Sequence, residues 1–582
     1  MTKVRIAACQ INPTVGDLEN NSNKIITALK DCEAMGTDLA VFPELALTGY
    51  PPEDLTIKPG FAKKSLEYAQ RIAASASKTV GIFGFIEPGS DPDTSQELVV
   101  REDSDFGEHI FHKAYNSAAI VADSDIFGIC RKQVLPNYSV FDEKRVFLKP
   151  SADKKIYLIA GVGIGVVICE DAWIKNGPIA TFVDDSTDLI VVINASPFCT
   201  GKLDERIDII KERVTEINKP IFYVNMVGAQ DELVFDGGSF LIGTDLNIVF
   251  SAPQFKEGNF IFDLEIPDKQ IRQDKKSSPV TSISLRPLIK NGEPVHFTIK
   301  GLTEIEQIYS ALVTGTRDYV NKNTFKGALI GLSGGIDSSL VAAIAVDALG
   351  ADNVIGIAMP SRYNAHESLT DAQELASLLN IDFKTIPIES VHKEFESLFN
   401  QTLEMRLEGL AGENIQSRIR GVILMAISNL NSYLVLTTSN KSELAVGYST
   451  LYGDSAGGFS VIKDVLKTQV YELCKWRNLQ GYVIPENVLV KPPSAELRFD
   501  QRDDQSLPPY DLLDACLIEL INHDHIVSEI DSDKYPLEVL QRIANLIDAA
   551  EYKRRQSPPG IKISSKSFGK DRRMPITNRF RD

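Results

Sequence analysis

FKGALIGLSGGIDSS, residues 325–339, is the stretch that decides how the second half of the chain folds. Residues 328–332 form an apolar run typical of a buried strand, and the LVAAIAVDAL that follows the stretch is typical of a helix. The turn between them contains Gly334, Gly335 and Asp337. Unpaired backbone N–H groups and the positive end of a helix dipole point into such a turn. The stretch therefore predicts a binding site for a nucleotide phosphate.

The side chains of this turn refine the prediction. Ser333, Ser338 and Ser339 add hydroxyl donors, and no lysine follows the glycines, so the stretch is not a Walker loop. A carboxylate at Asp337 beside phosphates indicates that a divalent cation separates them. SGGIDSS resembles the pyrophosphate loop of the ATP pyrophosphatases, which split ATP into AMP and pyrophosphate. The alternative is a glycine turn that binds no ligand.

Composition excludes several classes of protein. The 582 residues are 43% hydrophobic and 24% charged, as in ordinary globular domains, and the formal net charge of −18 argues against a nucleic-acid partner. No apolar run reaches roughly 18 residues, and MTKVRIAACQI does not read as a signal peptide. We therefore expect a cytoplasmic protein with no membrane partner. Seven scattered cysteines without a C-x-x-C pair argue against a disulfide framework and a zinc site.

Two α/β series divide the chain. Strand-like runs alternate with helical stretches from residues 4–11 to residues 220–228, and this rhythm stops near Pro267. Residues 267–300 are polar and rich in turn formers, and a second series starts near Leu302. We expect a first domain at residues 1–265, a linker at 266–300 and a second domain at 301–582. The second series predicts a doubly wound parallel sheet with ATP at the strand ends.

Three reactive residues follow strand-like runs in the first domain. Glu44 lies in VFPELALTGYPPEDL, Lys132 in CRKQVLPNYSVFDEKRVF and Cys169 in GVVICEDAW. A thiolate nucleophile needs a base and a cation that holds the developing oxyanion, and these residue types supply both. Taken singly, each has an ordinary structural interpretation as a core or surface residue.

FPELALTGYP, LPNYSVFDE and VVICEDAW together resemble the three signature blocks of the nitrilase superfamily. The resemblance implies an α-β-β-α sandwich in which Glu44 is the general base, Lys132 stabilises the tetrahedral intermediate and Cys169 attacks the carbon of an amide.

Further residues are weaker candidates for the same site. Glu143 is either an additional acid beside Lys132 or an exposed loop carboxylate, and Lys113 is a rival cation to Lys132. Glutamine binding is expected to involve Tyr138 and the segment Asn194–Lys202, which includes Ser196. Lys202 would pair with the α-carboxylate of the substrate.

The second domain offers acids and cations near its predicted strand ends. Glu443 follows a strand that ends in Thr437 and Thr438, and it is suitably placed to share Mg²⁺ with Asp337. Arg418, near a helix start, is positioned to meet an anion. Lys463 and Lys467 are candidates for neutralising the departing pyrophosphate. Arg362 is either a nucleotide contact or a surface residue. The predicted ATP contacts are Ser333, Gly334, Gly335, Asp337, Ser338, Ser339, Arg418, Thr438 and Lys467.

ENIQSRIRG, TTSNKSELAVGYSTLYGD, PPSAEL and KRRQSPPGIKISSKSFGKDRRMPITNRF resemble the synthetase half of the glutamine-dependent NAD synthetase family. The resemblance spans nearly the whole chain. It implies that glutamine hydrolysis supplies ammonia, that ATP with Mg²⁺ adenylates deamido-NAD, and that ammonia displaces AMP to give NAD. It also implies deamido-NAD contacts at Glu443, Asp454 and Lys566, a C-terminal segment Ser564–Arg573 that orders around nucleotide, and a homodimer or larger homo-oligomer.

Two alternatives remain at this point. One is another glutamine amidotransferase with a pyrophosphate-loop synthetase, although Cys169 is neither N-terminal nor flanked by glycines. The other is a nucleotide sensor without catalysis, against which the retained reactive residues argue. Because ammonia is largely protonated in neutral water, we also expect an enclosed passage between the two sites, with no residue assigned to it.

Overall fold

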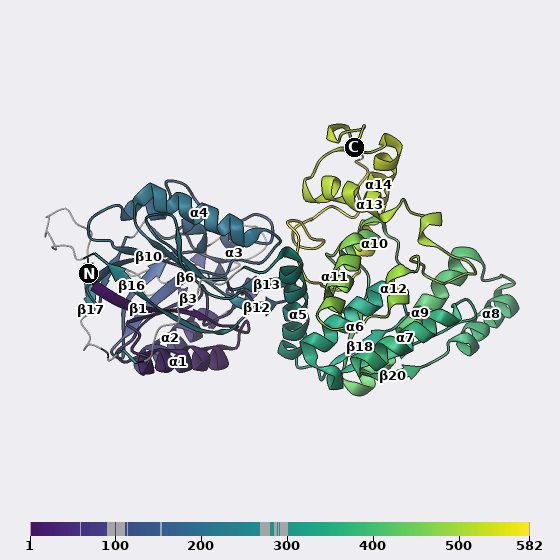
Figure 1. Ribbon diagram of the computed structural model, residues 1–582, viewed down its shortest axis with the longest axis horizontal. Coiled ribbons are helices and arrows are strands. Elements are labelled where there is room, and N and C mark those ends of the chain that lie inside the picture. The colour runs from purple at the N-terminus through teal and green to yellow at the C-terminus, as the bar shows by residue number, and fades with distance from the viewer. Residues whose placement is uncertain are drawn as a thin grey trace. The chain divides into compact units, whose positions relative to one another are not determined.

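The computed structural model describes residues 2–58, 60–89, 99–100, 111–112, 114–151, 154–267, 280–283, 288, 290–291 and 301–580. Lys113 and most of the predicted linker lie outside the described residues. The chain divides into two compact units, one of Met1–Gln230 and Phe235–Leu302, the other of Asp231–Val234 and Thr303–Asp582 (Figure 1). No helix among the described residues is long and apolar enough to cross a membrane. None of the seven cysteines, which all lie among the described residues, forms a disulfide.

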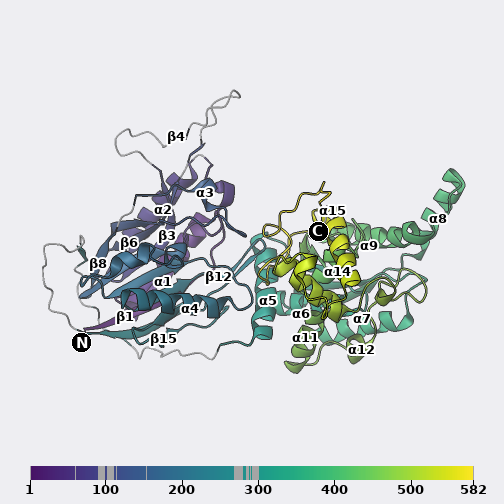
Figure 2. The same ribbon diagram turned by 90° about the horizontal axis from the view of Figure 1, so that it is seen from above.

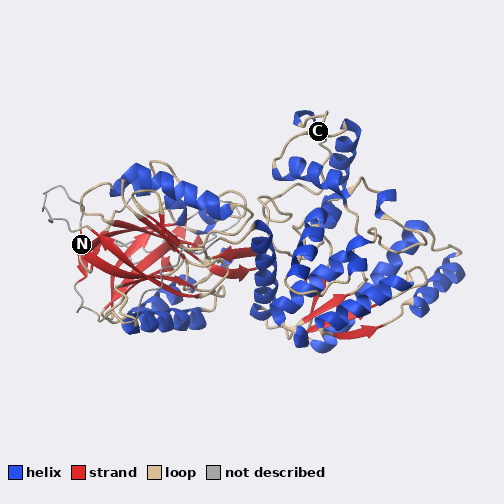
Figure 3. Ribbon diagram, in the orientation of Figure 1, coloured by secondary structure: helices blue, strands red, loops and turns tan. Residues whose placement is uncertain are grey.

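Unit 1 contains a six-stranded sheet and a seven-stranded sheet (Figure 3). The six-stranded sheet has the order β16-β1-β2-β3-β6-β7. Its strands are β1 (Thr2–Gln10), β2 (Leu39–Val41), β3 (Val80–Pro88), β6 (Ala114–Ala122), β7 (Asp125–Arg131) and β16 (Gly258–Ile266). The seven-stranded sheet has the order β15-β14-β11-β10-β9-β8-β17. Its strands are β8 (Ile156–Ile159), β9 (Val162–Ile168), β10 (Leu189–Asn194), β11 (Ile221–Asn225), β14 (Phe240–Ile242), β15 (Ile248–Ser251) and β17 (Val280–Ile283).

Helices cover the outer faces of these sheets. Alternation along β1 sends Val4, Ile6 and Ala8 into a core shared by both sheets, while Ala7 and Cys9 face the helices α1 (Leu18–Ala34) and α2 (Phe61–Ser75). The outer face of the other sheet packs on α4 (Lys202–Ile217). The layers are therefore α-β-β-α, which confirms the predicted sandwich. Unit 1 also contains a short helix α3 (Glu143–Val146) and β12 (Val227–Gln230). The partner of β12 in a two-stranded sheet is β13 (Leu233–Asp236), whose first two residues belong to unit 2.

Unit 2 is built on a five-stranded parallel sheet with the order β20-β19-β18-β21-β22. The strands are β18 (Ala328–Gly331), β19 (Val354–Ala358), β20 (Asp382–Thr385), β21 (Leu434–Thr437) and β22 (Phe459–Ser460). The order reverses at β18, so the carboxyl ends of β18 and β21 form the switch point where doubly wound sheets bind ligands. This arrangement confirms the predicted fold class.

Helices surround this sheet (Figure 2). One core joins β18, β19 and β21 to α9 (Gly409–Asn431), and α6 (Ile336–Leu349) packs with α5 (Glu304–Lys322) and α11 (Lys467–Leu479). A separate core joins α10 (Lys441–Val446), α13 (Tyr510–Leu517) and α14 (Leu537–Ala549) in a C-terminal helical lobe. The remaining helices are α7 (His366–Leu379), α8 (Glu389–Leu403), α12 (Glu486–Val490) and α15 (Glu551–Arg554).

Candidate active sites

Three charged side chains form a buried cluster in unit 1. Lys132, only 1% exposed, donates from Nζ to Glu44 Oε1 at 2.7 Å and to Glu143 Oε1 at 2.8 Å. Burial alone would lower the Lys132 pKa, but the negative charges of Glu143 and Glu44 outweigh it and hold that pKa well above its usual value. Lys132 is therefore a buried cation at neutral pH.

Glu44 and Lys132 are positioned by strand ends. Glu44 lies three residues beyond β2, and Lys132 directly follows β7. Asn116 on β6 donates to Glu44 Oε1 at 2.7 Å, and the backbone N–H of Ala195 donates to Glu44 Oε2 at 3.1 Å. Ala195 directly follows β10 of the other sheet, so groups from both sheets orient the one carboxylate. A carboxylate held in this way is preorganised as a base.

Cys169 directly follows β9 and begins a short 3-10 helix, with a left-handed backbone (φ 47°) that is rare for residues other than glycine. Burial and the charge of Glu44 raise the Cys169 pKa, while Lys132 lowers it. The balance is a pKa well above the usual thiol value, so the resting side chain is a neutral thiol. It therefore needs a base to become nucleophilic.

Glu143 is a buried carboxyl group with a raised pKa. It accepts a hydrogen bond from the Tyr50 hydroxyl at 2.9 Å as well as from Lys132. Burial raises its pKa to about 7, with the charge of Glu44 adding to the rise and Lys132 opposing it. Of the two predicted placements, the buried acid beside Lys132 is the one observed.

Asp171 joins the cysteine turn to the lysine segment, and sequence reasoning did not single it out. Its Oδ1 accepts the backbone N–H groups of Gln133 at 3.0 Å and Val134 at 2.8 Å, and its Oδ2 accepts that of Ile168 at 3.2 Å. The residues that follow Lys132 and precede Cys169 are thus held by one buried carboxylate. The only signal in the sequence was an acid two residues after the cysteine in CEDA.

The predicted glutamine contacts lie in different environments. Tyr138 is 53% exposed and donates to Glu170 Oε2 at 3.0 Å. The Ser196 hydroxyl is buried and accepts from Arg206 Nε at 3.1 Å. Lys202 pairs with Glu205 at 2.9 Å, and its Nζ lies 4.2 Å from the centroid of the Trp173 ring. Tyr138 and Lys202 are therefore accessible to a substrate, whereas Ser196 supports the segment from within.

In unit 2 the turn between β18 and α6 is closed by its own side chains. Ser333 Oγ accepts the Gly335 N–H at 3.1 Å and lies 3.1 Å from Ser338 Oγ, and the Ser338 and Ser339 hydroxyls both donate to Gly335 O. Gly334 has φ 78°, and a Cβ there would lie 2.1 Å from Ser368 O. No larger side chain fits at this position without moving the backbone of α7.

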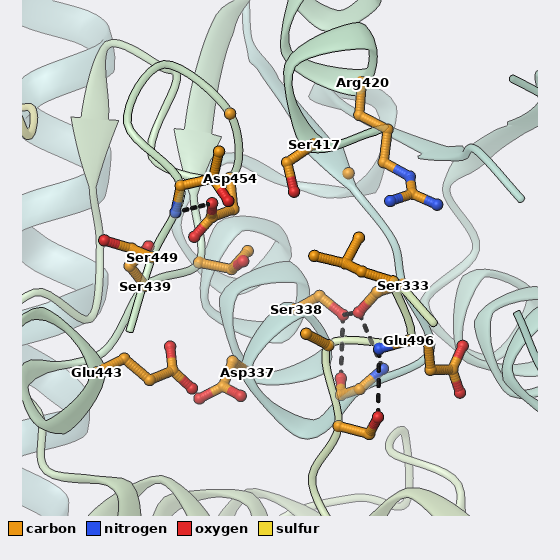
Figure 4. A pocket seen from close by; sticks show the side chains of 18 of the residues that line it. Ser333, Asp337, Ser338, Ser417, Arg420, Ser439, Glu443, Ser449, Asp454 and Glu496 are labelled. Atoms are coloured by element: carbon orange, nitrogen blue, oxygen red, sulfur yellow. Dashed lines mark hydrogen bonds between the residues drawn. The ribbon is translucent and has the colours of Figure 1, made fainter. Parts of the chain in front are cut away.

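A pocket of about 430 Å³ opens at the switch point of the sheet, within the size range of small-ligand sites (Figure 4). Residues of this turn, of the end of β21 and of α9 line the pocket. Predicted residues among its lining are Ser333, Gly335, Asp337, Ser338, Thr438, Glu443, Asp454 and Lys467. Figure 4 shows Asp337 and Glu443 on one side of this space and Asp454 across it.

Asp337 and Glu443 share a single cation. Lys467 Nζ lies 2.5 Å from Asp337 Oδ2 and 3.2 Å from Glu443 Oε1, and Asn440 donates to Asp337 Oδ1 at 2.8 Å. Burial raises the Glu443 pKa to about 8, with Lys467 opposing and Asp337 adding to the rise. Carboxylate oxygens are the donors that Mg²⁺ prefers, and Glu443, with its raised pKa, would lose its proton when it binds the ion. The donor set therefore fits a magnesium ion.

Other predicted residues of unit 2 lie elsewhere. The pocket lining, as far as the chain is described, does not include Gly334, Ser339, Arg418 or Lys566. Arg418 Nε donates to Leu451 O at 3.2 Å, and the Lys566 ammonium pairs with Asp524. Lys463 donates to Pro558 O, and Arg362 pairs with Glu389 and Glu396.

Arg420 lines the pocket in place of Arg418, and sequence reasoning missed it. It donates from Nε to Met359 O at 3.0 Å and from Nη2 to Asn364 Oδ1 at 3.1 Å. Burial lowers its pKa to about 10. SRIRG offers two arginines two residues apart, on different faces of a helix, and only packing selects one of them.

Comparison with known proteins accounts for both halves of the chain. Residues 5–276 match the carbon-nitrogen hydrolase family and residues 308–557 match the NAD synthase family. The glutamine-dependent NAD(+) synthetase of Thermotoga maritima is 42% identical, covering 100% of both chains, and that of Synechocystis sp. is 40% identical, covering 99% of both. The chain belongs to the glutamine-dependent NAD(+) synthetase family. In this family a glutaminase-type domain is fused to an NAD synthase domain.

Solved structures support the same assignment. The glutamine-dependent NAD+ synthetase of Acinetobacter baumannii, solved in complex with ADP, is 36% identical with a TM-score of 0.73 and 99% coverage of each chain. That of Cytophaga hutchinsonii has a TM-score of 0.77 at 21% identity, which shows the fold alone. Unit 1 thus corresponds to the glutaminase-type part of this synthetase family, and unit 2 to the NAD synthase part.

Proposed function

We propose that the chain is a C–N ligase that makes NAD from deamido-NAD, with glutamine as nitrogen donor and ATP as the activating substrate. The observation that carries the proposal is the presence, in one chain, of a buried Glu44–Lys132 pair beside Cys169 and of a pocket at the Asp337 turn. Family membership names the reaction that requires both sites. We retain residues 1–265, 266–300 and 301–582 as the proposed domain limits.

In the first half-reaction Glu44 takes the proton of Cys169. Because the thiol pKa is raised, this transfer must accompany attack on the side-chain carbonyl carbon of glutamine rather than precede it. Collapse of the tetrahedral intermediate breaks the C–N bond, and the proton held by Glu44 goes to the leaving ammonia. Glu44 then takes a proton from water as the water oxygen attacks the thioester carbon. The C–S bond breaks to release glutamate, and Glu44 returns the proton to the Cys169 thiolate.

Lys132 and Glu143 set the electrostatics of that step. Lys132 is cationic and buried, so it stabilises the oxyanion in a medium of low dielectric, where such an interaction is strong. Glu143, with a pKa of about 7, accepts a second hydrogen bond from Lys132 and helps to hold it in place. Tyr138 and Lys202 are the proposed glutamine contacts at the rim, with Ser196 supporting them.

In the second half-reaction the turn at residues 333–339 holds the phosphates of ATP. Asp337 and Glu443 would hold Mg²⁺, which when bound supplies positive charge to the phosphate oxygens. Lys467, already between those carboxylates, neutralises charge on the departing pyrophosphate. We propose Arg420 and Thr438 as further nucleotide contacts, with Arg418 and Lys566 as weaker candidates because of where their side chains lie.

Deamido-NAD is proposed to enter the same pocket with its carboxylate toward ATP. Asp454, on the far side of the pocket from the turn, is the proposed contact for it, together with Glu443. Attack of the carboxylate on the α-phosphorus releases pyrophosphate, and neutral ammonia then displaces AMP. We propose that ammonia travels between the sites without equilibrating with solvent, and that the chain acts as a homo-oligomer.

One substitution tests the division of labour. Cys169→Ala is expected to abolish NAD formation from glutamine and to retain NAD formation from added ammonium salt, measured with deamido-NAD, ATP and Mg²⁺. The matched control is Cys130→Ala, which removes a half-buried thiol in β7 and should leave both activities intact. Loss of both activities in Cys169→Ala, in a folded preparation, would contradict the proposal. Wild-type protein that binds ATP and forms no NAD would favour a nucleotide sensor.

A further inference from the structure

Two histidines and a glutamate come together at the end of α13, in the C-terminal helical lobe of unit 2. The helix continues past Leu517 as a π-helix over Ile518–Asn522, and the His523 N–H donates to Ile518 O at 3.1 Å. Asp524 then takes a left-handed conformation (φ 55°), and the His525 N–H donates to Glu519 O at 3.1 Å. The chain reversal therefore brings His525 back to the turn that contains Glu519 and His523.

The three side chains converge on one point. Nδ1 of His523 lies 3.1 Å, and Nδ1 of His525 lies 3.0 Å, from the same oxygen, Glu519 Oε2. Within the described chain these are three residues whose metal-ligating atoms all lie within 4.8 Å of one another. The imidazoles are about half exposed, at 50% and 46%, whereas Glu519 is 23% exposed. Water can therefore complete a coordination shell from the open side.

The donor set selects the class of ion. Two imidazole nitrogens and one carboxylate oxygen suit late first-row divalent metals such as Zn²⁺, whereas Mg²⁺ and Ca²⁺ prefer oxygen alone. In a tetrahedral shell, metal–ligand bonds of about 2.0–2.2 Å place the ligand atoms about 3.3–3.6 Å apart, so each Nδ1, now 3.1 or 3.0 Å from Glu519 Oε2, would move slightly away from it. A bound ion would bring the two nitrogens, which lie within 4.8 Å of each other, into the same shell.

The residues between these ligands hold the C-terminal segment of the chain. Asp524, between the histidines, pairs with the Lys566 ammonium. Asn522 Oδ1 accepts from Lys441 Nζ at 3.2 Å, and the same Nζ donates to Ser564 Oγ and to Lys566 O, both at 2.8 Å. Any ion that fixes the turn at residues 519–525 would thus also restrain Ser564–Lys566.

We propose that Glu519, His523 and His525 form a binding site for a late first-row divalent metal ion, and that the bound ion stabilises the contact between this turn and the segment Ser564–Lys566. The site is separate from the Asp337 and Glu443 carboxylates and uses no residue of either catalytic pocket. It does not depend on the reaction proposed above.

Calorimetric titration of the untagged full chain with Zn²⁺, in buffer containing excess Mg²⁺, tests the site. We expect binding of one Zn²⁺ per chain, weakened at least tenfold in His523→Ala, in His525→Ala and in Glu519→Gln, because each removes one of three ligands. His366→Ala removes another exposed histidine, on α7, and should bind as the wild type does. The proposal would be overturned if the wild type did not bind Zn²⁺. It would also be overturned if the three ligand variants, with the same midpoint of thermal unfolding as the wild type, bound Zn²⁺ with the wild-type affinity.

Hydrogen exchange tests the link to the C-terminal segment. Zn²⁺ is expected to slow amide exchange at residues 564–567 in the wild type, and to have no such effect in His523→Ala. Asp524→Ala retains all three ligands and loses the Lys566 ion pair, so it should bind Zn²⁺ with less protection of that segment. Exchange at residues 564–567 that does not respond to Zn²⁺ in a wild type that binds it would refute the stabilising role.

Discussion

Replacing Glu143 by glutamine should remove a pH dependence from the stability of unit 1. Burial raises the Glu143 pKa to about 7, from 4.5 in an unfolded chain. A group whose folded pKa is raised contributes its full stability below the unfolded pKa and loses it as pH rises toward the folded pKa. The wild type should therefore lose stability between about pH 4.5 and pH 7, and a side chain that cannot ionise should not.

The size of the effect follows from the difference in pKa. A difference of about 2.5 units at about 1.4 kcal/mol per unit gives roughly 3.5 kcal/mol. The chain has two tryptophans, Trp173 in unit 1 and Trp476 in unit 2. In a Trp476→Phe background the fluorescence of Trp173 therefore reports the urea unfolding of unit 1 alone, which is measured at pH 4.5 and pH 8. The unfolding free energy of Glu143→Gln relative to the parent should rise by about this amount between the two pH values.

A matched variant separates this effect from general changes in charge. Glu67→Gln removes an exposed carboxylate from α2 of the same unit and should follow the pH profile of the parent. If Glu143→Gln also kept the parent's dependence of unfolding free energy on pH, burial would not raise the pKa of Glu143 in the folded protein, and the prediction would be wrong.

Three further substitutions test the sites. Gly334→Ala should abolish ATP binding in calorimetry and spare glutamine hydrolysis, because its Cβ would lie 2.1 Å from Ser368 O at a positive φ; tight ATP binding would contradict this. Lys467→Met should lower ammonium-dependent NAD formation by about 10²-fold or more, because Asp337 and Glu443 lose the cation that they share. A smaller loss would show that Lys467 does not act in the reaction. Asp171→Asn should lower kcat for glutamine hydrolysis by about tenfold with little change in KM, since one carboxylate hydrogen bond is worth about 1.5 kcal/mol, and unchanged kcat would show that the bridge is not needed.

Local sequence patterns predicted the α/β fold of unit 2, whereas the sandwich of unit 1 was predicted from the resemblance of three motifs to a known superfamily. The apolar run, glycine turn and helix at residues 325–349 predict a strand–turn–helix unit, and the structure contains β18 followed by α6. The prediction for unit 2 succeeds because periodicity and turn chemistry act over a few residues, within the range that a sequence displays directly.

The composition of each site depends on contacts between distant residues, which such patterns do not display. Lys132 meets Glu44 across 88 positions because β7 and β2 end at the same edge of one sheet, and Asp171 bridges two loops that the sequence leaves unrelated. SRIRG cannot reveal that Arg420 rather than Arg418 reaches the pocket, because that depends on the rotation of α9 against β18. Sequence thus determines which chemical groups stand at the ends of strands. Packing, which sets the register and rotation of each element, determines which of those groups meet.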